Sequence, residues 1–496
     1  VHDLKQTHQT ILRNYPILGH MRFLLEFIRP EIRQYFIESE TEAAPFSRAQ
    51  RSLVYARAKG QSDKRPLGTQ LDVQAVGYEW ITHSMAPSTI ASDDMRTRIG
   101  GKDCTQPYDI SLFNISAMSF GALSANAILS LNKGAKLGGF AHDTGEGSIS
   151  KHHLAHGGDI IWEVASGYFG CRTPEGRFDP EKFTHNALLP SVKMIEIKLS
   201  QGAKPGHGGV LPGPKVTPEI AEARGVPVGV DCVSPASHSA FSTPNGLLDF
   251  IVQLRTLSGG KPVGFKLCIG HPWEWFAIAK AMSERQVLPD FIVVDGAEGG
   301  TGAAPLEFSD HLGMPMREGL TLVHNTLVGL GLRDRIKLGA SGKIVSAFDM
   351  ACALALGADW CNSARGFMFA VGCIQAQNCH TGHCPTGVAT QDPIRQMALV
   401  VSDKSVRVKN FHHQTLDALR ELLQAAGLNN PNDIDPSMIH KRLSLTEVST
   451  LAALYPRISP NSLLNSDQAS SWPEPFRTHW ASASSAQFQR LPQTTH

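Results

Sequence analysis

The sequence predicts an α/β protein built on a (β/α)8 TIM barrel, with an N-terminal helical region and a helical C-terminal extension. From Tyr108 onward, short apolar runs alternate with stretches of helical periodicity, which is typical of a parallel sheet covered by helices. About eight such repeats follow one another over roughly 260 residues, the usual size of one (β/α)8 barrel. A doubly wound open sheet is the alternative, but it would show an early G-x-G-x-x-G turn. No such turn stands in the required place.

The barrel elements can be assigned in chain order. Each short apolar run is expected to form a strand, and each longer stretch with helical spacing of apolar residues a helix. The expected strands are Ile110–Ser116, Ile160–Ala165, Val192–Lys198, Val228–Cys232, Val263–Cys268, Phe291–Val294, Ile336–Leu338 and Trp360–Asn362. The expected helices are Ala125–Leu137, Pro218–Ala223, Leu247–Leu257, Glu274–Glu284, Leu320–Leu330 and Ala347–Leu356.

Two flanking regions lie outside the expected barrel, which spans residues 108–391 and ends in a cysteine-rich loop at 372–391. Within residues 1–107, the segment 11–38 alternates apolar and basic residues, so we expect short amphipathic helices that pack on the main domain or lie on a membrane surface. Within residues 392–496, Val408–Ala426 has helical periodicity. The last 30 residues are rich in Ser, Gln, Pro and Thr, and we expect them to be poorly ordered on the surface.

The composition indicates an ordinary globular protein of the cytoplasm. Forty-six basic residues against 45 acidic ones leave a net charge of +1, which gives no indication of nucleic acid as a partner. Nine cysteines, three of them clustered, do not resemble a disulfide framework, so a reducing compartment is expected. No run of 18 uncharged apolar residues occurs. The sequence begins with Val1, so we expect missing residues upstream, and a membrane segment could be among them.

Three cysteines lie close together late in the expected barrel. Cys373, Cys379 and Cys384 follow the spacing C-x5-C-x4-C. Thiolates at this density are soft ligands, which suit iron–sulfur clusters or zinc better than hard cations. Three thiolates leave a four-cornered cluster one ligand short, which points to a three-iron cluster. Zinc stays open at this point, because His380 and His383 could complete a Cys3His set.

Glycine-rich turns follow the last two expected strands. TIM barrels often build a phosphate site from the loops after strands 7 and 8. These loops are Gly339–Lys343, with Ser341, Gly342 and Lys343, and Ser363–Gly366, with Ala364, Arg365 and Gly366. Backbone N–H groups opened by glycine, with a cation beside them, favour an anion. The first loop is not a P-loop, because Lys337 stands where the first glycine is required. Together the two loops indicate a phosphorylated cofactor.

Two further loops and one lysine stand at or near expected strand ends. The stretch 295–302 contains four glycines, so its backbone can approach a flat ring closely. The stretch 201–209 carries polar side chains on a loop that glycine makes adaptable. Lys266 lies inside an apolar strand, where a charge must be paired or functional. A lysine that faces an electron-rich ring would suit a flavin, whose reduced form carries negative charge near N1. The alternative is an ion pair inside the barrel.

Five motifs together resemble the central FMN-binding domain of glutamate synthase. They are AMSFGALS at Ala117–Ser124, DTGEG at Asp143–Gly147, QGAKPGHGG at Gln201–Gly209, EGGTGAAP at Glu298–Pro305 and CPTGVATQ at Cys384–Gln391. The resemblance covers roughly residues 110–427. It implies a (β/α)8 barrel that binds FMN and a three-iron, four-sulfur (3Fe-4S) cluster. The three clustered cysteines match the family's ligand spacing, so the resemblance favours the cluster over zinc.

The resemblance implies reductive amination of 2-oxoglutarate or a related 2-oxo acid. In the family, ammonia condenses with the keto group, and reduced FMN delivers a hydride from N5 to the imine. The matching motifs assign catalysis to Glu146, Gln201 and Lys204, and keto-acid binding to Lys204, His207 and Arg224, which ends the family pattern KVxxxIAxxR. Arg can hold a carboxylate with two bonds, while Lys polarises the keto oxygen. The expected FMN contacts are Ala117, Met118, Ser119, Thr144, Gln201, Lys266, Gly299, Gly300, Thr301, Ser341, Gly342, Lys343, Ala364, Arg365 and Gly366.

The chain departs from the family pattern in three ways. His207 stands where the family has a glutamate, and Val210 where it has a glutamine. Nothing in the sequence resembles the glutaminase domain that frees ammonia in the large synthases. The C-terminal domain that follows the barrel there has no counterpart either. The chain therefore resembles a stand-alone bacterial homologue of the synthase domain, which implies an upstream membrane segment and anchoring to the inner face of the cell membrane.

The sequence thus predicts a homo-oligomeric oxidoreductase with FMN and an iron–sulfur cluster. Its substrates would be a 2-oxo acid with ammonia or an amine, and its electrons would come from a ferredoxin or a reductase subunit. Two rival enzymes share the architecture: an N-methylglutamate synthase-like subunit, and an FMN-dependent dehydrogenase of another amino or hydroxy acid. A rival of another class is a non-catalytic electron-transfer subunit.

Overall fold

The computed structural model describes residues 1–91 and 95–492 and divides the chain into two units, Val1–Leu53 and Val54–His496. The first unit contains α1 (His2–Lys5), α2 (Thr10–Asn14), α3 (Leu18–Ile32) and a π-helical turn at Arg33–Ile37. Helices thus form where the amphipathic segment predicts them. α4 (Arg48–Ala58) follows, with its last residues in the second unit.

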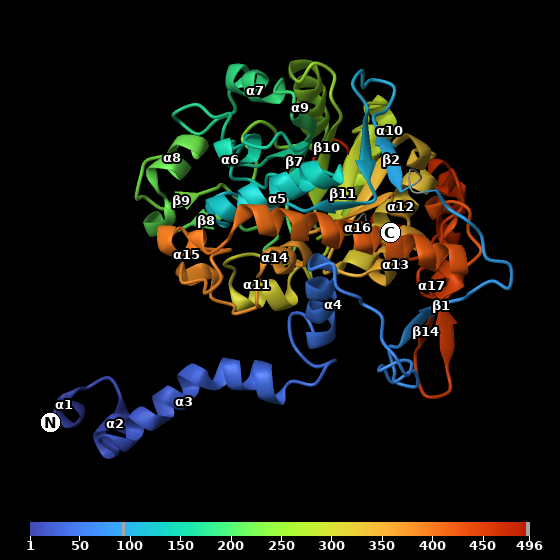
Figure 1. Ribbon diagram of the computed structural model, residues 1–496. Helices are drawn as coiled ribbons and strands as arrows, with labels where there is room; N and C mark the ends of the chain where they lie inside the picture. The colour runs from blue at the N-terminus through green and yellow to red at the C-terminus, as the bar shows by residue number, and fades with distance from the viewer. Residues whose placement is uncertain (92–94, 493–496) are drawn as a thin grey trace. The chain divides into compact units, whose positions relative to one another are not determined.

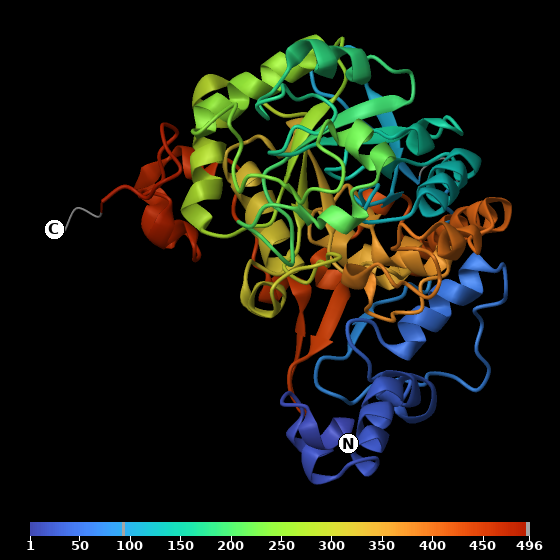
Figure 2. The same cartoon turned by 90° about the vertical axis from the view of Figure 1, so that its left-hand side faces the viewer.

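The second unit is organised around a closed, eight-stranded parallel barrel, as the sequence predicts. In chain order the strands are β4 (Phe113–Ile115), β5 (His142–Asp143), β6 (Ile160–Val164), β7 (Val192–Lys198), β10 (Val263–Leu267), β11 (Phe291–Asp295), β12 (Lys337–Ser341) and β13 (Trp360–Ser363). Each strand pairs with the next, and β13 closes the ring by pairing with β4. Figure 1 and Figure 2 show these strands surrounded by helices.

The helices around the barrel include all six that the sequence predicts, with small shifts at their ends. They are α5 (Ala125–Gly138), α6 (Lys151–Leu154), α7 (Pro180–Ala187), α8 (Pro218–Arg224), α9 (Pro244–Leu257), α10 (Pro272–Arg285), α11 (Leu306–His311), α12 (Met316–Gly329), α13 (Ala347–Ala355) and α14 (Arg365–Val371). Local chemistry fixes several starts. Ser124 caps α5 by accepting a hydrogen bond from the Ala127 N–H, and Thr243 caps α9 with proline next in sequence.

The barrel interior changes character from one end to the other. A buried apolar cluster joins barrel residues such as Ile161, Met194 and Val293 to Ile99 and Ile110. The last two come from the antiparallel hairpin of β2 (Arg96–Ile99) and β3 (Tyr108–Ser111). Side chains alternate along a strand, so the residue two positions beyond an inward apolar residue also faces inward. By this rule the charged residues near the carboxyl ends of several strands face the interior above the apolar cluster.

One expected strand is wrong, and one barrel strand was not expected. Val228–Cys232 is not a barrel strand: Val228 and Val230 are exposed, and only Cys232–Val233 forms β9, which pairs with β8 (Val210–Leu211) outside the barrel. The missing barrel strand is β5, at His142–Asp143. Two residues that open a glycine motif give no apolar run, so periodicity could not find this strand. The numbering of strands 7 and 8 is unaffected.

Two strand boundaries also differ from expectation. The expected strand Ile110–Ser116 is divided between β3 of the hairpin and β4 of the barrel. The first expected phosphate loop begins later than predicted, because Gly339, Ala340 and Ser341 still belong to β12. Gly339 serves packing there, since an added Cβ would lie 2.5 Å from the Trp360 ring.

The flanking regions are not purely helical, which corrects the description of residues 1–107 and 392–496. β1 (Glu79–Ile81) pairs with β14 (Ile439–Arg442), which also pairs with β15 (Val448–Thr450). The helices of the C-terminal region are α15 (Pro393–Met397), α16 (Val401–Ala425), α17 (Leu451–Leu454) and α18 (Phe476–His479). α16 starts earlier than expected and lies against α5 at Gly134, where an added Cβ would sit 2.4 Å from Val408.

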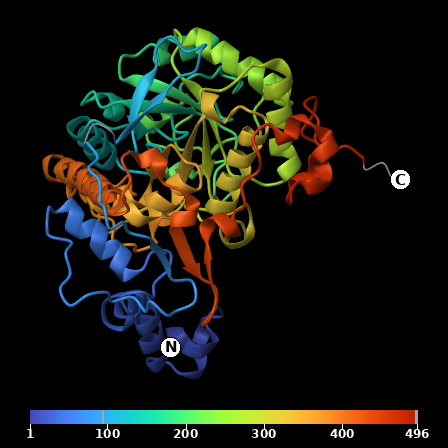
Figure 3. The ribbon, with the colours of Figure 1, turned by 90° about the vertical axis from the view of Figure 1, so that its right-hand side faces the viewer.

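The C-terminal segment is packed against the barrel helices, contrary to expectation. The rings of Phe476 and Phe276 stack with centroids 5.1 Å apart, and Lys280 donates hydrogen bonds to the carbonyls of Trp480 and Ala483. Figure 3 shows this segment, in red, beside the yellow-green helices. A few aromatic residues provide the buried apolar surface, although the segment is mostly polar. Residues 493–496 lie outside the described residues.

None of the helices in the described parts of the chain combines the length and the apolar character that crossing a membrane requires.

Candidate active site at the barrel mouth

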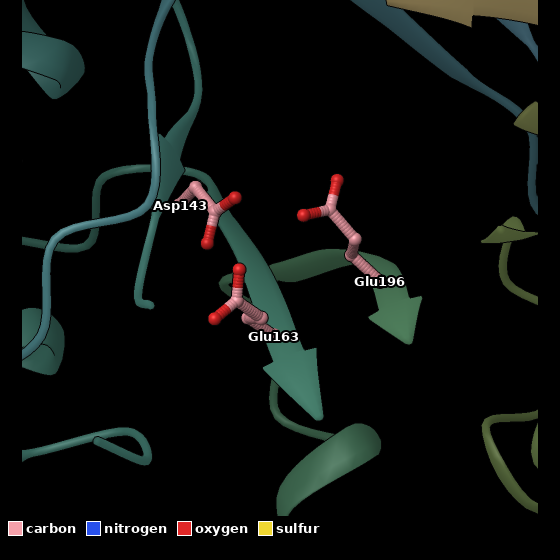
Figure 4. A group of neighbouring side chains, drawn as sticks. All are labelled: Asp143, Glu163 and Glu196. Atoms are coloured by element: carbon pink, nitrogen blue, oxygen red, sulfur yellow. The ribbon is translucent and has the colours of Figure 1, made fainter. Parts of the chain in front are cut away.

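A buried group of charged side chains lies inside the barrel near the carboxyl ends of its strands. Asp143, Glu163 and Glu196 come from three successive strands, and Figure 4 shows their carboxylates turned toward one another. One ligand atom from each lies within 4.8 Å of the other two. Lys266 supplies the matching cation: its ammonium contacts Glu163 and lies 3.1 Å from the Oε1 of Glu196. The ion-pair interpretation of Lys266 therefore describes this arrangement, and a role toward a flavin stays a prediction.

The charged residues of this group shift one another's pKa values. Burial would lower the pKa of Lys266, but Glu163 and Glu196 raise it well above its usual value. Burial, together with repulsion from Glu196, raises the pKa of Asp143 well above its usual value. The lysine ammonium thus lies beside two of these carboxylates and balances part of their negative charge. The group forms an internal ion network.

A second ion pair connects this network to the predicted catalytic residue Glu146. The Nζ of Lys198, at the end of β7, lies 2.9 Å from Glu146 Oε2 and 4.0 Å from Glu163 Oε1. Burial would raise the pKa of Glu146, but Lys198, followed by Lys204 and Arg224, lowers it to about 2. Glu146 is therefore a carboxylate at every physiological pH, with three cations around it.

Arg224 brings the AMSFGALS motif to the same place. This buried side chain ends α8 and donates a hydrogen bond to the carbonyl of Phe120 at 3.1 Å, with Ser119 Oγ 3.5 Å away. Its guanidinium also lies 5.1 Å from the centre of the Phe169 ring. The described residues offer its Nε no hydrogen-bond partner. A buried donor without a partner is costly, so this nitrogen favours an acceptor from a ligand.

The predicted loop 201–209 packs between these residues and the glycine-rich loop after β11. An added Cβ at Gly209 would lie 1.9 Å from Glu146 Oε1, and one at Gly202 would lie 1.8 Å from the Gly296 carbonyl. The Gly202 N–H also donates to Asp295 Oδ2 at 2.7 Å. Lys204 is buried in this loop, and burial lowers its pKa although Glu146 opposes the change. Glycine is thus required where the loops approach one another.

The loops after strands 7 and 8 each contribute a cation, and Lys343 and Arg365 interact electrostatically. Their contact with a phosphate stays a prediction. Burial lowers the pKa of Arg365 to about 10, and burial with repulsion from Arg365 lowers the pKa of Lys343. Arg365 also donates to the carbonyl of Glu298 at 2.7 Å, and an added Cβ at Gly300 would lie 3.0 Å from its guanidinium. Ser341 donates to the carboxylate of Asp295. Two repelling cations beside close backbone turns form a site that an anion would stabilise.

The three clustered cysteines lie on one loop after α14, and none forms a disulfide. Burial would raise the pKa of Cys384, but hydrogen bonds from Thr386 and from backbone N–H groups lower it, whereas burial raises the pKa of Cys379. Tetrahedral zinc at about 2.3 Å would set the sulfur atoms about 3.8 Å apart. Within the described ranges, however, the thiols and the neighbouring histidines do not form a three-ligand set within 4.8 Å. The three-iron cluster at this loop stays a prediction.

Three of the predicted site residues, Thr144, His207 and Thr301, are exposed or use their side chains elsewhere. The Thr144 hydroxyl is used inside the barrel wall, because it donates to the Gly145 carbonyl and accepts from the Glu163 N–H. His207 is exposed, and its ring lies edge-on to Phe308 on α11 with centroids 5.6 Å apart. Thr301 is also exposed. Their predicted cofactor and substrate contacts stay predictions.

The sequence interpretation missed several charged residues of the site. Lys198, Glu163 and Glu196 are central to the ion networks but belong to none of the five motifs. Glu163 and Glu196 carried the signal that singled out Lys266, namely a charge within an apolar strand. Asp143 stands at the first position of the DTGEG motif, but no pattern assigned it a role.

Comparison with known proteins agrees with this geometry. A family model described as the conserved region in glutamate synthase matches residues 79–429. The chain belongs to the glutamate synthase family. Membership makes it a glutamate synthase-like oxidoreductase, and the matched region contains the barrel, the charged site and the cysteine loop.

Two relatives show how far the glutamate synthase likeness extends. The glutamate synthase large subunit-like protein YerD of Bacillus subtilis is 39% identical over 473 residues, which cover 87% of this chain and 89% of that protein. The archaeal glutamate synthase [NADPH] of Methanocaldococcus jannaschii is 39% identical over 317 residues, which cover 64% of this chain and 59% of that protein. The matched region thus spans little more than half of the archaeal relative.

Proposed function

We propose that this chain reductively aminates 2-oxoglutarate or a related 2-oxo acid, using FMN and an iron–sulfur cluster. The observation that carries the proposal is the convergence of Lys204, Arg224 and Lys198 around Glu146. An anionic keto acid needs cations. The described residues offer the buried Nε of Arg224 no hydrogen-bond partner, so this donor suits a carboxylate. The two relatives' names support the same reaction class.

The residues of this site can direct the formation of an imine. Arg224 would hold a carboxylate of the keto acid, and the Lys204 ammonium would donate a hydrogen bond to the keto oxygen. The nitrogen of ammonia then forms a bond to the keto carbon. The carbonyl oxygen takes two protons, passed from the nitrogen with Lys204 as the intermediary, and leaves as water. Glu146 keeps Lys204 charged at the start of this exchange, because its carboxylate raises the pKa that burial lowers.

The site residues also fit the two proposed cofactors. Lys343 and Arg365 would hold the phosphate of FMN, since an anion would offset the repulsion that lowers the pKa of Lys343. When bound, FMN would supply the hydride that reduces the imine. The half-buried, unbridged thiols of Cys373 and Cys379, with the buried thiol of Cys384, suit a three-iron cluster, which would carry single electrons from a donor protein. A ferredoxin or a reductase subunit is the proposed donor, and a homo-oligomeric state stays a prediction.

Reoxidation of the reduced enzyme tests the function. The flavin of the reduced, anaerobic protein should be reoxidised by 2-oxoglutarate with ammonia, and glutamate should appear in equal amount. Lys204→Met should abolish reoxidation but retain flavin, while Lys136→Met, at an exposed position on α5, should behave as the parent protein.

Other outcomes identify the rival functions. A requirement for methylamine in place of ammonia would identify an N-methylglutamate synthase-like enzyme. Reduction of the flavin by a different amino or hydroxy acid, with no response to 2-oxoglutarate, would identify a dehydrogenase. Electron transfer to a donor or acceptor protein without any small-molecule turnover would leave only an electron-transfer subunit.

A further inference from the structure

Lys215 connects the segment that leads to Arg224 with the cysteine loop. It begins the segment KVTPEIAEAR, whose last residue, Arg224, lies in the proposed keto-acid site. Its Nζ donates a hydrogen bond of 2.6 Å to the backbone carbonyl of Cys379, 164 positions away in sequence. Its stem also covers the loop, since an added Cβ at Gly382 would lie 3.6 Å from its Cε. None of the roles assigned above uses this lysine.

The charge of Lys215 lies near two of the clustered cysteines. The side chain is partly buried, and its ammonium interacts electrostatically with the thiols of both Cys379 and Cys384. A cation there stabilises added negative charge on the sulfur ligands.

A second hydrogen-bond donor, the uncharged Tyr55, contacts the cysteine loop at Cys373. The hydroxyl of Tyr55, on α4, donates a hydrogen bond of 2.7 Å to the carbonyl of Cys373, and its ring packs edge-on against Phe369. Two of the three cysteines are therefore fixed through their backbone carbonyls by residues from distant parts of the chain. Tyr55 lies outside the matched family region, whereas Lys215 lies inside it.

We propose that Lys215 is a positioning residue that orders the cysteine loop and raises the reduction potential of the cluster bound there. The proposal rests on the proposed cluster. Reduction adds one negative charge to the cluster, and the Lys215 ammonium stabilises that charge while its hydrogen bond fixes the loop. Tyr55 contributes order to the same loop but no charge, so the two residues separate the effects.

Redox titration of the iron-loaded protein tests the charge. Lys215→Met should shift the midpoint downward by about 59 mV, which is a tenfold change in the ratio of reduced to oxidised cluster for a one-electron couple. Lys215→Arg keeps the charge and should stay near the parent midpoint. Tyr55→Phe and Lys136→Met should leave the midpoint unchanged. Parent-like midpoints for Lys215→Met would overturn the proposal.

Hydrogen exchange of the protein as purified tests the ordering and does not depend on the cluster. Lys215→Met should speed exchange of backbone amides around residues 379–384 by about tenfold, since the lost hydrogen bond no longer opposes local opening of the loop. Tyr55→Phe should do so around residues 373–378. Unchanged exchange in Lys215→Met overturns the ordering role.

Iron analysis separates the presence of the cluster from the role of Lys215. A parent protein without iron, reconstituted anaerobically, would contradict the cluster and remove the effect on its potential, while the exchange comparison still decides whether Lys215 orders the loop. Iron retained by the parent and by Lys215→Arg but lost from Lys215→Met supports the proposal, because only the cation distinguishes these variants. Equal loss from both variants overturns the role of the charge.

Discussion

Glu146 and Lys204 set the charge of the proposed keto-acid site. Glu146 is stabilised as a carboxylate by Lys198 beside it at 2.9 Å, and in turn it opposes the effect of burial on the pKa of Lys204. A lysine whose pKa is lowered loses its charge at a lower pH than a solvent-exposed lysine. Keto-acid binding should therefore weaken on the alkaline side as Lys204 deprotonates.

Replacement of Glu146 by glutamine should move this alkaline loss to lower pH. The substitution removes the anion that stabilises the Lys204 ammonium, so the pKa of Lys204 falls further. Titration of the flavin spectrum with 2-oxoglutarate between about pH 7 and 10 measures the effect, since a free lysine titrates near 10.4. Glu175→Gln, at an exposed position, is the control. An alkaline limb at the same pH in Glu146→Gln and the parent would refute the coupling.

The Lys266 network should contribute to stability mainly through charge balance. Lys266→Met leaves Glu163 and Glu196 buried without their cation, and removal of one partner of a buried pair costs about 3–5 kcal/mol. Adding Glu163→Gln to the same chain should recover part of that loss, because the uncompensated charge is then smaller. Urea unfolding followed by tryptophan fluorescence gives both values. Equal stability of the single and double variants would contradict this account.

At the scale of elements, short strands and loops position the site more than the long helices do. β5 has only two residues, yet it supplies Asp143 and leads directly into the turn that carries Glu146. The close approach of Gly209 to Glu146 then limits where the loop 201–209 can lie. Helical periodicity predicted the outer layer well, because the burial of one face repeats along a helix. A two-residue strand inside a glycine motif leaves no comparable repeat.

The C-terminal segment is an element whose stability can be tested directly. Phe476 is almost fully buried and stacks on Phe276 of α10. Phe476→Ala should destabilise this packing by about 3–5 kcal/mol, the usual cost of truncating a buried phenylalanine. Hydrogen exchange in residues 459–492 measures the loss, with Leu464→Ala, at an exposed position, as the control. Equal exchange in the two variants would mean that the segment is held by other contacts.

At the scale of the whole molecule, closure of the barrel brings the chemistry together. The residues that surround Glu146 come from positions 198, 204 and 224, while the cations of the proposed phosphate site come from 343 and 365. Parallel strands place their carboxyl ends at one mouth, so residues far apart in sequence share one site. The apolar cluster, which includes residues of the β2–β3 hairpin, fills one part of the barrel interior. The charged residues lie nearer the carboxyl ends of the strands.

The sequence by itself determined the fold class, the order of the motifs, the glycine-rich turns after strands 7 and 8 and the cysteine spacing. These features are local, because apolar periodicity and glycine turns are written in consecutive residues. Only the tertiary structure decided that β5 completes the barrel, that Lys198 pairs with Glu146, and that Lys266 is enclosed by carboxylates. It also decided that Lys215 reaches the cysteine loop. Ion pairs and strand pairing join residues that no sequence pattern connects, and their strength depends on the burial that barrel closure creates.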